Sequence, residues 1–139
     1  MVLRAIIVGV AGGAATVLIA WSPLIPDPLA FHSVALAVIA AIYVGFAFLD
    51  GRVSIVILEL SVGTAFIVLG LLGLWQAPAF IAVGLILHAF WDLAHRPRGV
   101  TTKIPVWYPP FCAAFDFVFA GAFLLMAREL AARSQAVVP

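Results

Sequence analysis

The chain has 139 residues, of which 66% are hydrophobic and 9% are charged, and its formal net charge is +1. Soluble domains carry about 25% charged residues and nucleic-acid-binding proteins carry dense basic surfaces, so this composition excludes both classes. Together with a mean hydropathy of +1.26, it predicts a single all-α transmembrane domain over residues 1–139, embedded in the lipid bilayer.

Three apolar segments in the first part of the chain predict transmembrane helices. Each has close to the roughly 20 residues that a helix needs to cross a bilayer, and the expected bounds are about residues 3–21, 28–49 and 53–75. Pro23 ends the first segment, because proline cannot continue a helix. Asp27 before Pro28 is a typical start for the second, with the aspartate as N-cap.

Two more apolar segments predict helices at about residues 78–96 and 108–129, which makes a polytopic bundle of five spans. An odd number of spans places the two chain termini on opposite sides of the membrane. Most basic residues then share the side of the N-terminus: Arg4, Arg52, Arg96, Arg98 and Lys103, against Arg128 and Arg133 on the other side. The positive-inside rule therefore predicts a cell-membrane protein with a cytoplasmic N-terminus.

The sequence HAFWDLAH at residues 88–95 contains the most informative polar residues. His88, Asp92 and His95 are spaced by four and three residues, so a helix projects all three from one face. A charged side chain at the centre of a membrane helix costs about 2.5–3.5 kcal/mol on insertion scales. Such residues therefore indicate a functional site that faces protein or water.

Helix direction predicts that polar groups from four helices meet in the cytoplasmic half of the bundle. Glu59 lies about two turns into the third helix and Asp116 about two turns into the fifth. Tyr43 on the second helix and the 88–95 segment reach the same depth. Clustering in the bundle interior lowers the cost of each buried charge, so we expect these groups to form one pocket.

The ligand types in this layer favour a metal centre. Imidazoles and carboxylates bind zinc, iron or manganese, and we expect His88, His95 and either Asp92 or Asp116 to hold such a divalent metal. Glu59 is then the expected general base, with Asp116 as the second catalytic candidate. Metal-activated water would hydrolyse a lipid or another hydrophobic substrate.

Two other functions fit the same residues. A buried Glu59 or Asp116 that alternates between charged and neutral forms could couple proton movement to small-molecule transport, in a transporter or channel subunit. Alternatively, the polar residues could only specify helix packing in a non-catalytic accessory membrane protein.

Structural explanations compete with these roles at several positions. His95 could bond the terminal carbonyls of its helix, and Asp92 could pair with Arg96 one turn later. The secondary candidates are Tyr43, Trp91 and Cys112. The Tyr43 hydroxyl could reach Asp50 two turns along the same helix. Trp91 fits an interfacial anchor better than a substrate platform, and Cys112 fits a small buried filler.

Gly9 and Gly13 form a small-xxx-small face on the first helix, and Ala41 and Gly45 form another on the second. Small residues let helix backbones approach closely in lipid, where the hydrophobic effect no longer draws helices together. We expect packing roles for these positions, and a homo-oligomer through Gly9 and Gly13 is a further possibility.

The strings HAFWDLAHRP and IPVWYPPFCAAFD resemble a group of small uncharacterised bacterial membrane proteins of similar length. In that group a histidine, a Trp-Asp pair and a second histidine on one span precede a WYP segment and a further aspartate. The resemblance covers most of the chain. It implies a small polytopic protein of the bacterial inner membrane and supplies no activity or catalytic roles.

Overall fold

The computed structural model describes residues 1–95, 100 and 102–136, with side chains described up to residue 128. Within these residues all regular secondary structure is α-helical, which confirms the all-α prediction. The described part forms five helices: α1 (Val2–Ala20), α2 (Pro28–Asp50), α3 (Val53–Trp75), α4 (Ala79–Ala94) and α5 (Tyr108–Ala136).

The observed helix bounds follow the polar turns that separate the apolar segments. The Asp27 side chain accepts a hydrogen bond from the Ala30 amide at 3.0 Å, which confirms its role as the N-cap of α2. Gly51 ends α2 with a φ of 78°, a left-handed conformation that glycine adopts without steric cost. The expected bounds of α3 are confirmed.

The observed ends of α4 and α5 differ from the expected ones in opposite directions. α4 ends at Ala94 rather than at residue 96, with His95 as its C-cap. α5 continues to Ala136 instead of ending near Glu129. No proline or glycine lies between those two residues, so the amphipathic tail can extend the helix with good helix formers.

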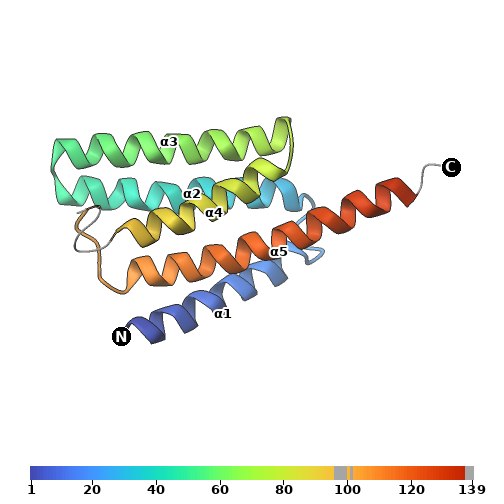
Figure 1. Cartoon of the computed structure of the whole chain (residues 1–139), viewed down its shortest axis with the longest axis horizontal. Coiled ribbons are helices and arrows are strands. Elements are labelled where there is room, and N and C mark those ends of the chain that lie inside the picture. The colour runs from blue at the N-terminus through green and yellow to red at the C-terminus, as the bar shows by residue number, and fades with distance from the viewer. Residues whose placement is uncertain (96–99, 101, 137–139) are drawn as a thin grey trace.

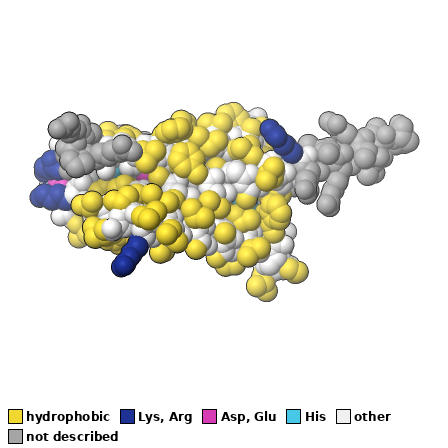
Figure 2. All heavy atoms as spheres, turned by 60° about the horizontal axis from the view of Figure 1, so that its bottom comes forward, with side chains coloured by type: hydrophobic (Ala, Val, Ile, Leu, Met, Phe, Trp, Pro, Cys, Tyr) yellow, Lys and Arg dark blue, Asp and Glu magenta, His cyan; other side chains and the backbone are white. Residues whose placement is uncertain are grey.

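Four of the described helices, all except α4, are long and apolar enough to cross a membrane. α4 has 16 residues, or about 24 Å at 1.5 Å per residue, which is shorter than a typical hydrocarbon core of about 30 Å. Hydrophobic side chains cover most of the face in Figure 2, and the basic side chains visible there lie near the two ends. Such a surface suits a lipid environment.

The short helix α4 lies in the middle of the bundle, between α2 and α5 in Figure 1, and it also packs against α3. Its apolar half contributes Ile81 and Leu85 to a buried core with Leu36 of α2 and Phe119 of α5. Gly84 allows this contact, because a Cβ at that position would collide with the Leu36 side chain. The central position of α4 makes its buried face the natural place for a site.

Helix α1 packs along α5 at the edge of the bundle (Figure 1). Gly9 and Gly13 are buried there, and a Cβ on either would meet a backbone carbonyl of α5, that of Phe111 or Phe115. The packing role predicted for both glycines is thus met inside one chain, so in this structure a second copy would have to use another face. Gly45 differs, because it is exposed and has no atom within contact distance of a Cβ.

Candidate metal and acid–base site

One end of the bundle holds the start of α1, the turn between α2 and α3 and the start of α5 (Figure 1), and it is called the polar end below. α4 reaches this end with its last turns. Its helical spacing brings His88 and Asp92 onto the same buried face, and both side chains are 0% exposed. They face the protein interior, as the site hypothesis requires.

His88 binds a carboxylate from the neighbouring helix. Its Nδ1 donates to Asp116 Oδ2 of α5 at 2.6 Å, and Asp92 Oδ2 lies 3.6 Å from the same nitrogen. The imidazole also makes an edge contact with Phe66 of α3, with ring centroids 5.0 Å apart. His88, Asp92 and Asp116, called the His88 cluster below, therefore join α4 to α5 inside an otherwise apolar interior.

Tyr43 joins the cluster from α2. Its hydroxyl donates to Asp92 Oδ1 at 2.5 Å, and the tyrosine side chain is fully buried. The expected contact between Tyr43 and Asp50 is wrong. Asp50 instead accepts from Arg52 Nε at 2.6 Å and from the Lys103 amide at 2.9 Å, at the outer edge of the polar end. This ion pair raises the pKa of Arg52.

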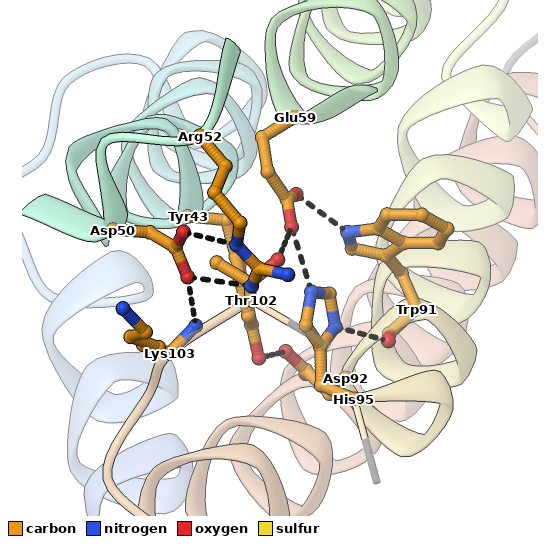
Figure 3. Close-up of polar contacts among 9 residues, drawn as sticks. All are labelled: Tyr43, Asp50, Arg52, Glu59, Trp91, Asp92, His95, Thr102 and Lys103. Carbon is orange, nitrogen blue, oxygen red and sulfur yellow. Dashed lines mark hydrogen bonds and ion pairs between the residues drawn. The ribbon is translucent and has the colours of Figure 1, made fainter. Parts of the chain in front are cut away.

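A second group, centred on Glu59 of α3, lies next to the cluster (Figure 3). Glu59 Oε1 lies 2.8 Å from His95 Nε2, within hydrogen-bond distance, and accepts from the Thr102 hydroxyl at 2.6 Å. Its Oε2 accepts from Trp91 Nε1 at 3.2 Å. Glu59, Trp91, His95 and Thr102, called the Glu59 group below, tie α3 to the end of α4 and to the connection before α5.

The hydrogen bonds of His95 require one shared proton. Its Nδ1 lies 2.8 Å from the Trp91 carbonyl oxygen, which can only accept, so Nδ1 must carry a hydrogen. Nε2 faces Glu59 Oε1, and this contact also needs a proton, on His95 or on Glu59. The pair is thus an imidazolium with a carboxylate, or an imidazole with a carboxylic acid.

Both ring nitrogens of His95 are therefore engaged, whereas the sequence hypothesis used this residue as a metal ligand. The expected contact of His95 with a terminal carbonyl of its helix is confirmed. The sequence hypothesis combined His88 and His95 with one aspartate, either Asp92 or Asp116. In the structure both aspartates lie beside His88, and His95 is not part of this cluster. Arg96, the expected partner of Asp92, lies outside the described residues.

Three buried polar atoms of the His88 cluster have no hydrogen-bond partner among the described residues: His88 Nε2, Asp92 Oδ2 and Asp116 Oδ1. Buried polar atoms are nearly always paired with protein, water or an ion, so each such atom needs an explanation. The three residues each offer one ligand atom, and these atoms lie within 4.8 Å of one another. One imidazole and two carboxylates match the donors that zinc, iron and manganese take, so the residues fit a divalent cation.

The His88 cluster and the Glu59 group touch through Tyr43. The Tyr43 ring centroid lies 4.4 Å from that of His95 and 5.7 Å from that of His88. Carboxylate, imidazole and hydroxyl groups thus form one array from Asp116 on α5 to Glu59 on α3. Polar groups from four helices, α2 to α5, therefore lie close together, as the sequence predicted.

A cavity of about 450 Å³ reaches the array from the polar end. Its polar wall consists of Asp92, His95 and Thr102, and the remaining lining residues are Val2, Leu93, Val100, Ile104, Val106, Pro109 and Pro110. Clefts of roughly 300–1,000 Å³ with a few polar groups in an apolar wall are typical ligand sites. The cavity therefore brings an apolar ligand up to His95 and Thr102, at the edge of the array.

The secondary candidates differ in what surrounds them. Trp91 is half-buried and donates to Glu59, so it serves the interior rather than standing only as an interfacial anchor. Cys112 is buried beside Tyr43 and Tyr108, which agrees with a filler role. Thr102 was missed by the sequence reasoning, because a threonine in a polar connection carries no signal of its own.

Fold and site together define a small helical protein with membrane-length apolar helices and a buried histidine–carboxylate array. The chain matches a family of unknown function, DUF6010, over residues 3–129, and it belongs to that family. None of the curated proteins matches the chain, and none of the solved structures does. Function is therefore inferred from the chemistry of the site itself.

Proposed function

We propose that this protein is a membrane-embedded, metal-dependent hydrolase of a lipid or another hydrophobic ester. In this proposal all five helices cross the cell membrane and the N-terminus is cytoplasmic. The polar end then carries Arg4, Arg52 and Lys103 on the cytoplasmic side, as the positive-inside rule favours. α4 is short for a span, but α2, α3 and α5 surround it, so little of its length needs to match the lipid.

The observation that carries the proposal is the convergence of unpaired ligand atoms in the His88 cluster. One imidazole can neutralise only one of two ionised carboxylates, so a second negative charge in this fully buried site is costly without a further positive partner. A divalent cation bound by His88, Asp92 and Asp116 would remove that cost. With three protein ligands, such a cation would leave a position for water and would supply Lewis-acid activation of that water.

The Glu59 group supplies proton transfer in this proposal. Water adds its hydroxyl to the carbonyl carbon of the ester, and the bond between that carbon and the leaving oxygen breaks. The leaving oxygen takes the proton shared by His95 and Glu59, and the pair regains a proton from the attacking water. Trp91 and Thr102 hold the Glu59 carboxylate by donating to it, which orients the pair toward the cavity.

Zinc analysis of the purified protein, reconstituted in lipid nanodiscs, tests the proposal together with hydrolysis of p-nitrophenyl laurate. We expect about one zinc per chain and an ester hydrolysis that a chelator abolishes and added zinc restores. His88→Ala should lose the zinc and the activity. Glu59→Gln should keep the zinc and lose at least tenfold in hydrolysis, within the range that general acid–base groups contribute. A wild type without stoichiometric zinc, iron or manganese would overturn the proposal.

The adjacency of the two groups supports a second candidate, a proton-coupled transporter or channel subunit. Chains of carboxylate and histidine side chains act as proton relays in membrane proteins, and Tyr43 lies between the two groups here, with a hydrogen bond to Asp92 and a ring contact with His95. Proton flux into liposomes that contain the reconstituted protein tests this candidate. A flux that Glu59→Gln abolishes, in protein that binds no metal, would favour it over the hydrolase.

A further inference from the structure

The cavity at the polar end opens through an apolar part of the surface. Its lining includes Val2 of α1 and Val106 of the connection before α5, whose side chains are 48% and 71% exposed. Trp107 follows directly and is 45% exposed, and tryptophan is enriched at the membrane–water interface. A ligand dissolved in the bilayer therefore meets the mouth of the cavity at headgroup depth.

The size of the cavity limits what it can hold. A volume of about 450 Å³ corresponds to roughly 15 groups of the size of a water molecule, at about 30 Å³ each. That is room for one apolar chain of about a dozen carbons with a small polar end. A phospholipid with two full acyl chains does not fit.

The polar wall limits the end group of the ligand. His95 and Thr102 are engaged with Glu59, and Asp92, which also lines the cavity, is 0% exposed. None of the described lining residues therefore turns an unpaired charge toward the cavity. A charged end group would leave water without a charged partner, which is costly, whereas an uncharged alcohol or ester end avoids this cost.

We propose that the cavity binds a membrane-dissolved amphiphile with a single apolar chain and an uncharged polar end. Its chain lies between Val2, Ile104 and Val106, and its polar end lies against His95 and Thr102. This names the substrate class of the proposed hydrolysis and therefore rests on the proposed function.

Photolabelling with a dodecanol that carries a diazirine in its chain tests the assignment, using full-length protein in phospholipid nanodiscs. The two-chain lipid of the disc is present in large excess and acts as a competitor throughout. We expect saturable labelling of the 100–110 segment and of the end of α4, removed by excess unlabelled dodecanol. Val106→Trp narrows the mouth and should lower this labelling at least tenfold.

Val53→Trp is the matched control, because Val53 also lies near the polar end and is 72% exposed, but it does not line the cavity. It should leave the labelling within twofold of the wild type. Labelling that does not saturate and spreads over the lipid-facing residues of α1, α2 and α3 would overturn the assignment. Equal labelling of Val106→Trp and Val53→Trp would overturn it as well.

Zinc content measured on the same samples separates the two proposals. Val106→Trp should keep its zinc, because the mouth of the cavity holds no ligand of the His88 cluster. A wild type that binds no metal but labels at the cavity would overturn the hydrolase and leave the amphiphile site standing. A wild type that binds zinc but is not labelled saturably would overturn the amphiphile site and leave the hydrolase standing.

Discussion

The two ends of the bundle each bury a histidine, and the two residues differ in how they are held. Among the described residues, His32, near the start of α2, bonds only the Pro28 carbonyl of its own helix, at 2.6 Å, and stacks on Phe119 with ring centroids 4.4 Å apart. His88 binds Asp116, which is 28 residues away, and lies beside Asp92. Both side chains are 0% exposed.

Burial alone therefore does not mark a functional histidine. His32 has a local backbone partner and aromatic neighbours, and its Nε2 is the one unpaired atom at that site among the described residues. At His88 the unpaired atoms come from three residues on two helices, and they converge. This convergence of unpaired atoms distinguishes a site that could bind a cation. Substitutions at His88 and His32 should therefore have unequal effects.

The largest effect is expected for His88→Phe. The substitution leaves Asp92 and Asp116 as buried carboxylates without the imidazole, and breaking a buried pair in this way costs about 3–5 kcal/mol. Unfolding by denaturant in mixed micelles measures the loss of stability. His88→Asn, which keeps a hydrogen-bond donor, should recover part of it. Equal stability of His88→Phe and the wild type would contradict the account of the cluster.

Tyr43→Phe should have the next largest effect. It removes the hydroxyl that donates to Asp92 Oδ1 and leaves the ring in place, and hydrogen bonds to charged groups contribute about 1.5–3 kcal/mol. The free energy of unfolding should fall by that amount. Tyr108→Phe is the control, because Tyr108 is buried in the same cluster beside Cys112, a weak hydrogen-bonding partner, and its hydroxyl makes no hydrogen bond to a carboxylate among the described residues. An equal loss of unfolding free energy in Tyr43→Phe and Tyr108→Phe would show that the hydrogen bond to Asp92 does not stabilise the fold.

Thr102→Val should cost less, about 1 kcal/mol, because Glu59 keeps two other donors and valine has nearly the same shape. Its larger consequence is on mobility of the connection before α5, which this bond ties to α3. We expect faster amide hydrogen exchange in residues 102–107, with exchange in α2 unchanged. Unaltered exchange in that connection would show that Thr102 does not anchor it.

His32→Phe should have the smallest effect, within about 1 kcal/mol of the wild type. It loses one hydrogen bond to Pro28, but it also removes the unpaired Nε2 from an apolar site and keeps the stack on Phe119. Zinc binding should be unchanged. A loss of stability as large as that of His88→Phe would break the contrast between the two ends.

The helices could be predicted from the sequence because the signals that start and end a helix are local. The Asp27 cap and the Gly51 turn act within a few residues, and composition alone revealed the apolar segments. The end of α5 was missed, because whether a polar tail stays helical depends on weak propensities rather than on a single stop residue. The pairing of α1 with α5 could not be predicted, because several helices carry small-residue faces of equal appearance.

The sequence predicted the depth at which the site residues lie along the helices. It did not predict which histidine pairs with which carboxylate. Helical spacing placed His88 and Asp92 on one face, and topology placed Glu59 and Asp116 nearby. Which carboxylate meets which histidine depends on the lateral order and rotation of the helices, about which spacing says nothing. His95 therefore bonds Glu59, and Asp116 bonds His88, although the sequence favoured the two histidines as a pair of ligands.

X-ray absorption at the zinc edge of the zinc-reconstituted protein tests the central claim most directly. The arrangement of the His88 cluster predicts one imidazole nitrogen and carboxylate oxygens around the metal, at about 2.0–2.2 Å. His32→Phe should leave the spectrum unchanged, and Asp116→Asn should alter it. Two imidazole ligands would restore the pair of His88 and His95 and contradict this account, and so would a protein that binds no zinc at all.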